Sequence, residues 1–289
     1  MKKVVIGYIY SNKRLSKDER LFLKEAEKRN IQLATINLLE EFDLNKIKEK
    51  LKDCKYVFNN SAEEFAFEVV KTLEEFGKIV IDSSMTYYYD EDKWMFFLKC
   101  KKFKIPTPNT ILLSENINLA KEEIRKFNNW PVILKRIQGS NGEFVARAKN
   151  LNDAEKIIKK FWKKGSEKLP IIAQEFIESS CYRIMTLDGK VVQTAVKESR
   201  MWKKMYVPSN DRKVKRIKID KELKEIIQKI MNAFKITICG IDLFKKDGKW
   251  LVCEINSSPG LDFLRNERRK LVGKILDYLK KKSNHTASR

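Results

Sequence analysis

The sequence has a single histidine, His285, and its five cysteines never form a Cys-x-x-Cys pair. A histidine-dependent catalytic triad or an HExxH-type metal site therefore cannot be built. Because no two cysteines form a Cys-x-x-Cys pair, a zinc ribbon and a dithiol redox motif are excluded as well. No apolar run approaches the ~18 residues of a membrane span. Because widely spaced cysteines suit a reducing compartment, we expect a cytoplasmic protein.

Positive charge exceeds negative charge, with 61 Lys and Arg against 39 Asp and Glu in 289 residues and a formal net charge of +22. The lysines are spread along amphipathic segments such as 44–51, 154–164 and 221–234. This spread favours solvated helix faces over a nucleic-acid-binding arm. The charge would still attract an acidic ligand or an acidic protein partner.

The first part of the chain alternates between predicted strands and helices. The expected strands are 3–10, 31–36, 56–58 and 78–82, with helices over 17–29 and 62–76 between them. This alternation predicts an open parallel sheet. The turns carry no GxGxxG motif, so a dinucleotide site has no support.

The rest of the chain has a different texture. A helix over 90–102 leads into Ile105-Pro106-Thr107-Pro108, where two prolines impose an extended connection. Hairpins follow beyond Trp130. We expect an N-terminal α/β domain over 1–85, a central lobe with a phosphate loop over 86–177, and a C-terminal lobe with a metal site over 178–289.

The segment 240–256 reads as two strands around Asp247-Gly248. Apolar residues occupy odd positions, whereas Asp242, Glu254 and Asn256 occupy even ones. For both strands to bury the odd face, the loop needs an odd number of residues, which predicts a three-residue turn over 246–248. The three polar side chains then share one face, with oxygens that suit Mg²⁺ and a bound nucleotide.

A solvated polar face is the alternative for this segment. Trp250, Val252 and Phe244 also fall on even positions and are expected on the same face. A face with three large apolar side chains is not an ordinary solvated surface, so we favour the metal site.

Two weaker features accompany this hairpin. The loop Gly139-Ser140-Asn141-Gly142 follows Lys135 and exposes backbone N–H groups that suit phosphates, although Asn-Gly is typical of any hairpin. It is not a Walker A motif. The strand end Gln174 to Glu178 suits an adenine edge and ribose hydroxyls, with an ordinary edge strand as the alternative.

Together these pieces resemble the ATP-grasp superfamily, and within it the RimK-type glutamate ligases. The resemblance covers roughly 82–264, and its decisive part is the run Glu-Ile-Asn-Ser-Ser-Pro-Gly-Leu at 254–261, preceded by Gly240-Ile241-Asp242. Asp92-Lys93, 105–108, 131–135, the glycine loop and 174–177 match in the same order. The implied fold is α/β, with an open-sheet domain before two ATP-grasp lobes.

The resemblance also implies roles for individual residues. Lys93 and Lys135 would contact the ATP phosphates, and Gly139, Ser140, Asn141 and Gly142 would close over them. Adenine would lie against Gln174, Glu175, Phe176 and Ile177, and ribose against Glu178. Asp242, Glu254 and Asn256 would hold two Mg²⁺ or Mn²⁺ ions. Arg183 would stabilise the transferred phosphoryl group, with a surface arginine as the alternative.

The implied reaction is ATP-dependent amide formation through an acylphosphate. The segment 197–209 lacks the glycine pair of the family pattern, but it offers Lys197, Arg200, Lys203 and Lys204 as candidates for a substrate carboxylate. Acceptors of relatives include a ribosomal protein tail, polyglutamylated coenzymes and acidic carrier proteins. The competing hypothesis is a catalytically degenerate ATP-grasp protein that binds nucleotides or nucleic acid. Many relatives associate, so a homo-oligomer is one expected state.

Overall fold

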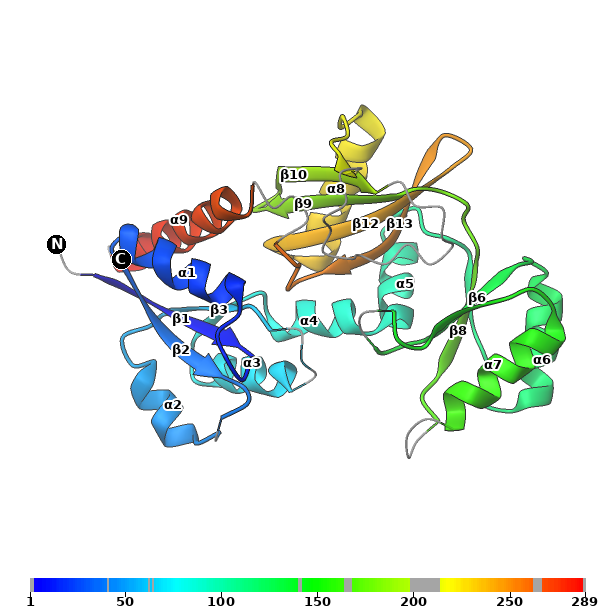
Figure 1. The fold of residues 1–289 in the computed structure, drawn as a ribbon, viewed down its shortest axis with the longest axis horizontal. Helices are drawn as coiled ribbons and strands as arrows, with labels where there is room; N and C mark the ends of the chain where they lie inside the picture. The colour runs from blue at the N-terminus through cyan, green and yellow to red at the C-terminus, as the bar shows by residue number, and fades with distance from the viewer. Residues whose placement is uncertain are drawn as a thin grey trace.

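The computed structural model describes residues 3–40, 42–61, 63, 65–139, 142–163, 168–197, 214–261 and 267–287. These residues form a mixed α/β fold with three separate sheets, as expected from the sequence. Figure 1 shows the first sheet at one end of the molecule, the second at the other end, and the third between and above them.

The first sheet is the expected open parallel sheet. Its strands follow the order β2-β1-β3-β4 and all pair in parallel. They are β1 (Val4–Tyr10), β2 (Ile31–Asn37), β3 (Tyr56–Asn59) and β4 (Ile79–Ile81), with helices α1 (Lys17–Lys28), α2 (Leu44–Lys50) and α3 (Ala66–Glu75) between them. Ser16 and Glu19 form a capping box that begins α1.

The second sheet is antiparallel, in the order β5-β8-β6-β7. Its strands are β5 (Thr110–Leu112), β6 (Val132–Arg136), β7 (Val145–Ala148) and β8 (Ile171–Glu175). The amphipathic helices α6 (Ile117–Phe127) and α7 (Leu151–Lys163) cover it through a core that includes Leu134 and Ile158.

The third sheet is also antiparallel, in the order β11-β10-β9-β12-β13. Its strands are β9 (Cys181–Leu187), β10 (Lys190–Lys197), β11 (Val214–Lys215), β12 (Ile238–Lys246) and β13 (Lys249–Asn256). Helices α5 (Lys93–Lys102) and α8 (Lys221–Phe234) pack on one face, where Ile184 and Ile241 join their core. The predicted hairpin at Asp188-Gly189 is confirmed, since Leu187 pairs with Lys190 and both turn residues have positive φ.

Two helices tie these layers together. Helix α4 (Ser84–Glu91) connects the first sheet to α5, and α9 (Arg268–Ala287) returns from the third sheet to pack on α1 and β1. In that contact, Leu271 and Ile275 share a core with Ile6 and Phe22. The first sheet is therefore held against one end of the third. The expected division at 85/86 and 177/178 stays a prediction.

Candidate active site

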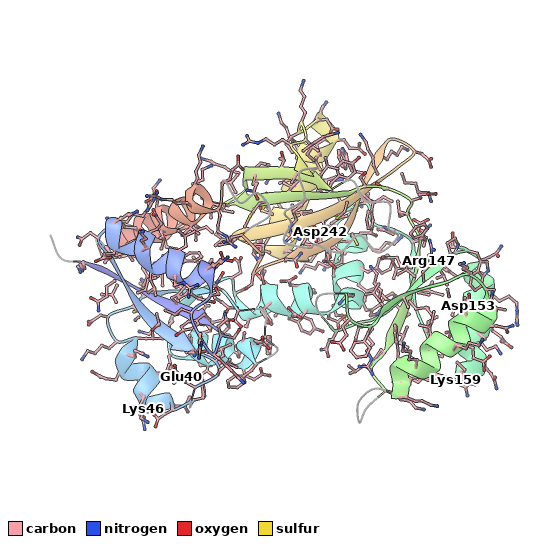
Figure 2. All side chains as sticks on the ribbon, viewed as in Figure 1. Glu40, Lys46, Arg147, Asp153, Lys159 and Asp242 are labelled. Carbon is pink, nitrogen blue, oxygen red and sulfur yellow. The ribbon has the colours of Figure 1, made fainter. Side chains whose placement is uncertain are left out.

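The hairpin of β12 and β13 places the expected metal-binding residues together. Asp242 pairs directly with Glu254, and Gly240 pairs with Asn256. In antiparallel strands, residues paired in this way project to the same side. Asp242 lies on the third sheet, above the junction of α4 and α5 in the view of Figure 2.

The predicted three-residue turn is wrong. Lys246 pairs with Lys249, so the loop is the two-residue Asp247-Gly248, with φ of 50° and 78°. Such a turn matches the twist of paired strands. The extra residue lies instead in a β-bulge of β13. Asp242 pairs with Glu254 and Leu243 pairs with Val252, so Cys253 has no paired residue on β12.

The bulge also corrects the expected faces of β13. Trp250 and Val252 are buried in the core with Leu243, and not on the polar face as the alternation indicated. One extra residue on one strand reverses the alternation beyond it. Glu254 and Asn256 therefore reach the side of Asp242 only because the bulge precedes them.

The donor set fits a divalent cation. Asn256 Nδ2 lies 3.4 Å from Asp242 Oδ2. Burial raises the pKa of Asp242, Arg183 opposes this effect, and the nearby Glu254 adds to it, so that the pKa is about 6. Two carboxylates held together away from water are expected to gain from a cation between them. The described residues contain no cluster of three or more His, Cys, Asp or Glu side chains, so this set combines two carboxylates and one amide.

Arg183 is a partly buried arginine at this site rather than a surface arginine. It pairs with Asp242 across β9 and β12, and its Nη1 donates to Asp242 Oδ2 at 2.5 Å. Its side chain is only 13% exposed. The guanidinium passes over Gly240, where a Cβ would lie 2.5 Å from Arg183 Nη2 and 2.8 Å from Pro259 Cβ. The glycine therefore leaves room for the arginine.

The substitution Gly240→Ala is expected to displace Arg183 from Asp242. The new methyl group meets both the guanidinium and the rigid ring of Pro259, and relieving such overpacking typically costs about 1–3 kcal/mol. We expect a lower unfolding free energy in urea and a loss of ATP turnover of roughly tenfold or more. Unchanged stability together with unchanged turnover would show that the arginine does not need this space.

Two lysines approach the carboxylates from other elements. Asp92 caps α5 by accepting the N–H groups of Trp94 and Met95, which fixes Lys93 at the start of the helix. Lys93 Nζ donates to the Gly139 carbonyl at 2.8 Å. Burial lowers its pKa, whereas Glu254 raises it. The ammonium group therefore lies within electrostatic reach of the Glu254 carboxylate.

Lys135 projects from β6. Its Nζ donates to Gln174 Oε1 at 2.8 Å and lies 3.9 Å from Cys253 Sγ, the bulge residue of β13. The second and third sheets therefore face each other across this lysine. Positive ammonium groups beside acidic side chains are the combination expected around a polyphosphate with divalent cations.

The segment 174–178 uses several side chains within the protein. Gln174 bonds to Lys135 and to Thr110, and Glu175 accepts from the Asn109 N–H and from Lys246. The ring of Phe176 lies 5.3 Å from the Arg147 guanidinium carbon, Ile177 is buried, and Glu178 is exposed. The role of this segment in holding adenine and ribose stays a prediction.

Several predicted residues are only partly described. Gly139 has φ of 123°, which favours glycine, and Gly142 has φ of 68°. Ser140, Asn141, Arg200, Lys203 and Lys204 lie outside the described residues, as does the side chain of Lys197. Their roles stay predictions.

One important contact was missed from the sequence. Asp90, in the last turn of α4, accepts both the backbone N–H and the hydroxyl of Ser257 at 2.6 Å. Burial raises its pKa to about 8. The Ser258 hydroxyl donates to the Ser61 carbonyl beyond β3 at 3.0 Å. The two serines thus anchor the end of β13 between α4 and the first sheet.

Comparison with known proteins assigns the sequence to a family. A family model described as the RimK-like ATP-grasp domain matches residues 90–279. The chain belongs to this family. The predicted resemblance and the predicted ATP-grasp fold are confirmed. The protein is an ATP-grasp ligase, and enzymes of this class form carbon-nitrogen bonds and generally use ATP and divalent metal ions.

The RimK-like chain has relatives of similar length. It is 29% identical over 219 residues to a probable alpha-L-glutamate ligase of Coxiella burnetii (strain Dugway 5J108-111), covering 74% of this chain and 71% of the relative. It is also 29% identical over 227 residues to the coenzyme gamma-F420-2:alpha-L-glutamate ligase of Methanocaldococcus jannaschii, covering 75% and 76%.

Two solved structures show the same fold. A RimK domain ATP-grasp protein from Sphaerobacter thermophilus superposes with a TM-score of 0.74 at 15% identity, covering 95% of this chain and 99% of that one. The D-alanine–D-alanine ligase of Bacillus anthracis, in complex with ATP, gives 0.72 at 18% identity, with 98% of both chains covered. Within the described residues, no helix is both long and apolar enough to cross a membrane.

Proposed function

We propose that this enzyme adds glutamate to an acceptor by an amide bond, using ATP and two Mg²⁺ or Mn²⁺ ions. The observation that carries the proposal is the joint placement of Asp242, Glu254 and Asn256 beside Arg183 and Lys93. The names of the relatives support glutamate as the amino acid. The acceptor would be an acidic protein or a polyglutamylated coenzyme.

The proposed chemistry has two steps. A substrate carboxylate oxygen attacks the γ-phosphorus of ATP, the bond to the β-phosphate oxygen breaks, and ADP leaves. An amine then attacks the acylphosphate carbonyl, the tetrahedral intermediate expels phosphate, and the nitrogen gives its proton to solvent. No step needs a histidine, because positioning and charge neutralisation supply most of the acceleration in phosphoryl transfer.

Each group at the site has a part in this scheme. Asp242, Glu254 and Asn256 would hold the ions, which when bound offset the negative charge of the phosphate oxygens. Lys93 and Lys135 would neutralise further phosphate oxygens and orient the triphosphate. Arg183 donates to Asp242 through Nη1, and its positive charge would stabilise the transferred phosphoryl group.

The test is coupled ADP release with Mg-ATP, L-glutamate and candidate acceptors, added singly and in pairs. The proposal expects ADP release only when L-glutamate and an acceptor are both present, with one ADP for each amide bond measured by mass spectrometry. Binding of ATP without ADP release across all pairs would instead support the degenerate nucleotide-binding protein. ADP release that is the same with an acceptor alone as with the acceptor and L-glutamate together would contradict amide formation.

A further inference from the structure

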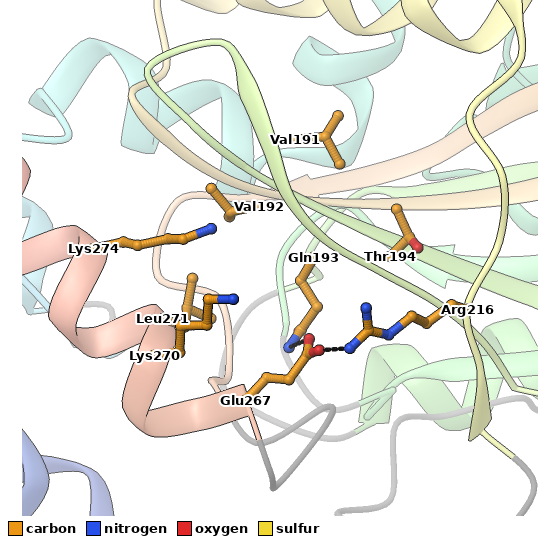
Figure 3. A pocket seen from close by; sticks show the side chains of 9 residues that line it. All are labelled: Val191, Val192, Gln193, Thr194, Arg216, Glu267, Lys270, Leu271 and Lys274. Atoms are coloured by element: carbon orange, nitrogen blue, oxygen red, sulfur yellow. Dashed lines mark hydrogen bonds and ion pairs between the residues drawn. The ribbon is translucent and has the colours of Figure 1, made fainter.

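A cavity of about 190 Å³ lies between β10 and the beginning of α9, away from the paired carboxylates. Figure 3 shows its lining, with side chains of β10 on one side and of α9 on the other. This volume admits an amino-acid side chain but not a nucleotide, since pockets for larger ligands usually have ~300 Å³ or more. The cavity therefore suits part of a ligand that extends beyond it.

The strand register connects this cavity to the candidate active site. Gln193 of the lining pairs with Met185, and two residues further Ala195 pairs with Arg183, the partner of Asp242. Because side chains alternate along a strand, Gln193 and Asp242 project from the same face of the sheet. With strands ~4.8 Å apart and ~3.3 Å per residue, their backbones lie roughly 12 Å apart, a distance that a few amino-acid residues span.

The lining is positively charged. Arg216, Lys270 and Lys274 face a single carboxylate, that of Glu267, which leaves a formal excess of two positive charges. Glu267 is already occupied, because it accepts from Gln193 Nε2 at 3.2 Å and from Arg216. Lys270 and Lys274 are one turn apart on α9, and no carboxylate of the described residues forms an ion pair with either.

The cavity lining also has an apolar part. Leu271 and Val192 form walls beside the two lysines. A ligand group with a short apolar stem and an anionic end matches such a cavity, because the stem is shielded from water while the end meets cationic groups. A glutamate side chain has this composition.

We infer that this cavity binds a glutamate side chain of the acceptor and thereby selects an acidic, glutamate-containing peptide segment. The inference rests on the proposed function, since it identifies the acceptor of the same reaction. The acceptor segment would run along the face of the third sheet, with one carboxylate at Lys270 and Lys274 and its reacting end near Arg183. The positive charge of the whole chain would favour the approach of such a segment.

The first test measures binding, so that it does not depend on turnover. Triglutamate peptide is titrated into the full chain by calorimetry, with triglutamine as the uncharged probe. We compare the double variant Lys270→Gln/Lys274→Gln with Lys221→Gln/Lys224→Gln, which removes the same charge from exposed positions of α8. Since α8 covers the opposite face of the sheet, this control keeps the net charge equal and leaves the cavity intact.

We expect triglutamate to bind and triglutamine to bind at least tenfold more weakly. The α9 variant should raise the Kd for triglutamate about five- to tenfold, and the α8 control should change it less than twofold. Equal effects of both variants would assign binding to net charge alone and overturn the inference. Absence of triglutamate binding to the unmodified chain would overturn it as well.

A second measurement separates this inference from the proposed function. In ADP-release assays, the α9 variant should raise KM for a glutamate-containing acceptor while kcat and KM for ATP stay within twofold. Turnover with an unchanged acceptor KM would leave the ligase function intact and overturn the cavity assignment. Specific triglutamate binding without ADP release for any acceptor would support the cavity assignment and contradict the proposed ligation.

Discussion

Replacing Glu254 by Gln is expected to reduce ADP release at least 100-fold, a loss of about 2.7 kcal/mol of transition-state stabilisation. The substitution keeps the size of the side chain and removes one of the two carboxylates that pair across β12 and β13. Mg²⁺ is commonly held by only one or two protein carboxylates, so losing one weakens the site strongly. Initial rates of ADP release at saturating ATP and a fixed Mg²⁺ concentration measure the effect.

The same hairpin offers a matched control. Asp247→Asn also converts a carboxylate to an amide, but Asp247 is exposed in the turn, where its φ of 50° suits Asn. We expect its rate within twofold of the unmodified protein. Raising Mg²⁺ should partly restore the Glu254→Gln variant, because the remaining donors still bind the ion. Full activity of Glu254→Gln at low Mg²⁺ would remove this residue from the proposed metal site.

The β12–β13 hairpin shows how far alternation of side chains can be interpreted. Residue types and spacing placed Asp242, Glu254 and Asn256 on one face, and the structure agrees. The pattern required one odd residue, but it could not distinguish a three-residue turn from a bulge, since both shift the alternation by one. Because a two-residue Asp-Gly turn has favourable geometry, the loop keeps two residues, and the extra residue lies in the bulge at Cys253.

Contacts between distant segments were beyond local patterns. No local pattern of the last helix indicates that α9 packs on α1 and β1 of the first sheet. Likewise, Asp90 and Ser257 are 167 positions apart, and neither lies in a pattern that names the other. Such contacts depend on how the layers pack against one another. The periodicity of a single sequence predicts helices and strands but not this packing.

Asp90 is expected to make the stability of the protein depend on pH. Its pKa is raised by burial to about 8, from an ordinary value of 3.8. Both of its hydrogen bonds from Ser257 go to Oδ2, so the other oxygen can carry the proton in the fold. Between these two pKa values the unfolded chain binds fewer protons at this residue than the folded chain. The contribution of protonated Asp90 is therefore complete below pH 4 and is lost as pH rises toward 8.

The variant Asp90→Asn resembles the protonated side chain but does not titrate. The unfolding free energy of this variant, measured in urea, should therefore rise relative to that of the unmodified protein. The difference should grow by about 1 kcal/mol for each pH unit as pH rises from 5 to 7. Asp90→Ala serves as the second variant, because it loses both bonds to Ser257 and should be less stable than Asp90→Asn at every pH. If the unmodified protein and Asp90→Asn keep a constant difference over this range, Asp90 is ionised in the fold. In that case the bonds from Ser257 would outweigh burial, and the end of β13 would be anchored by a charged carboxylate.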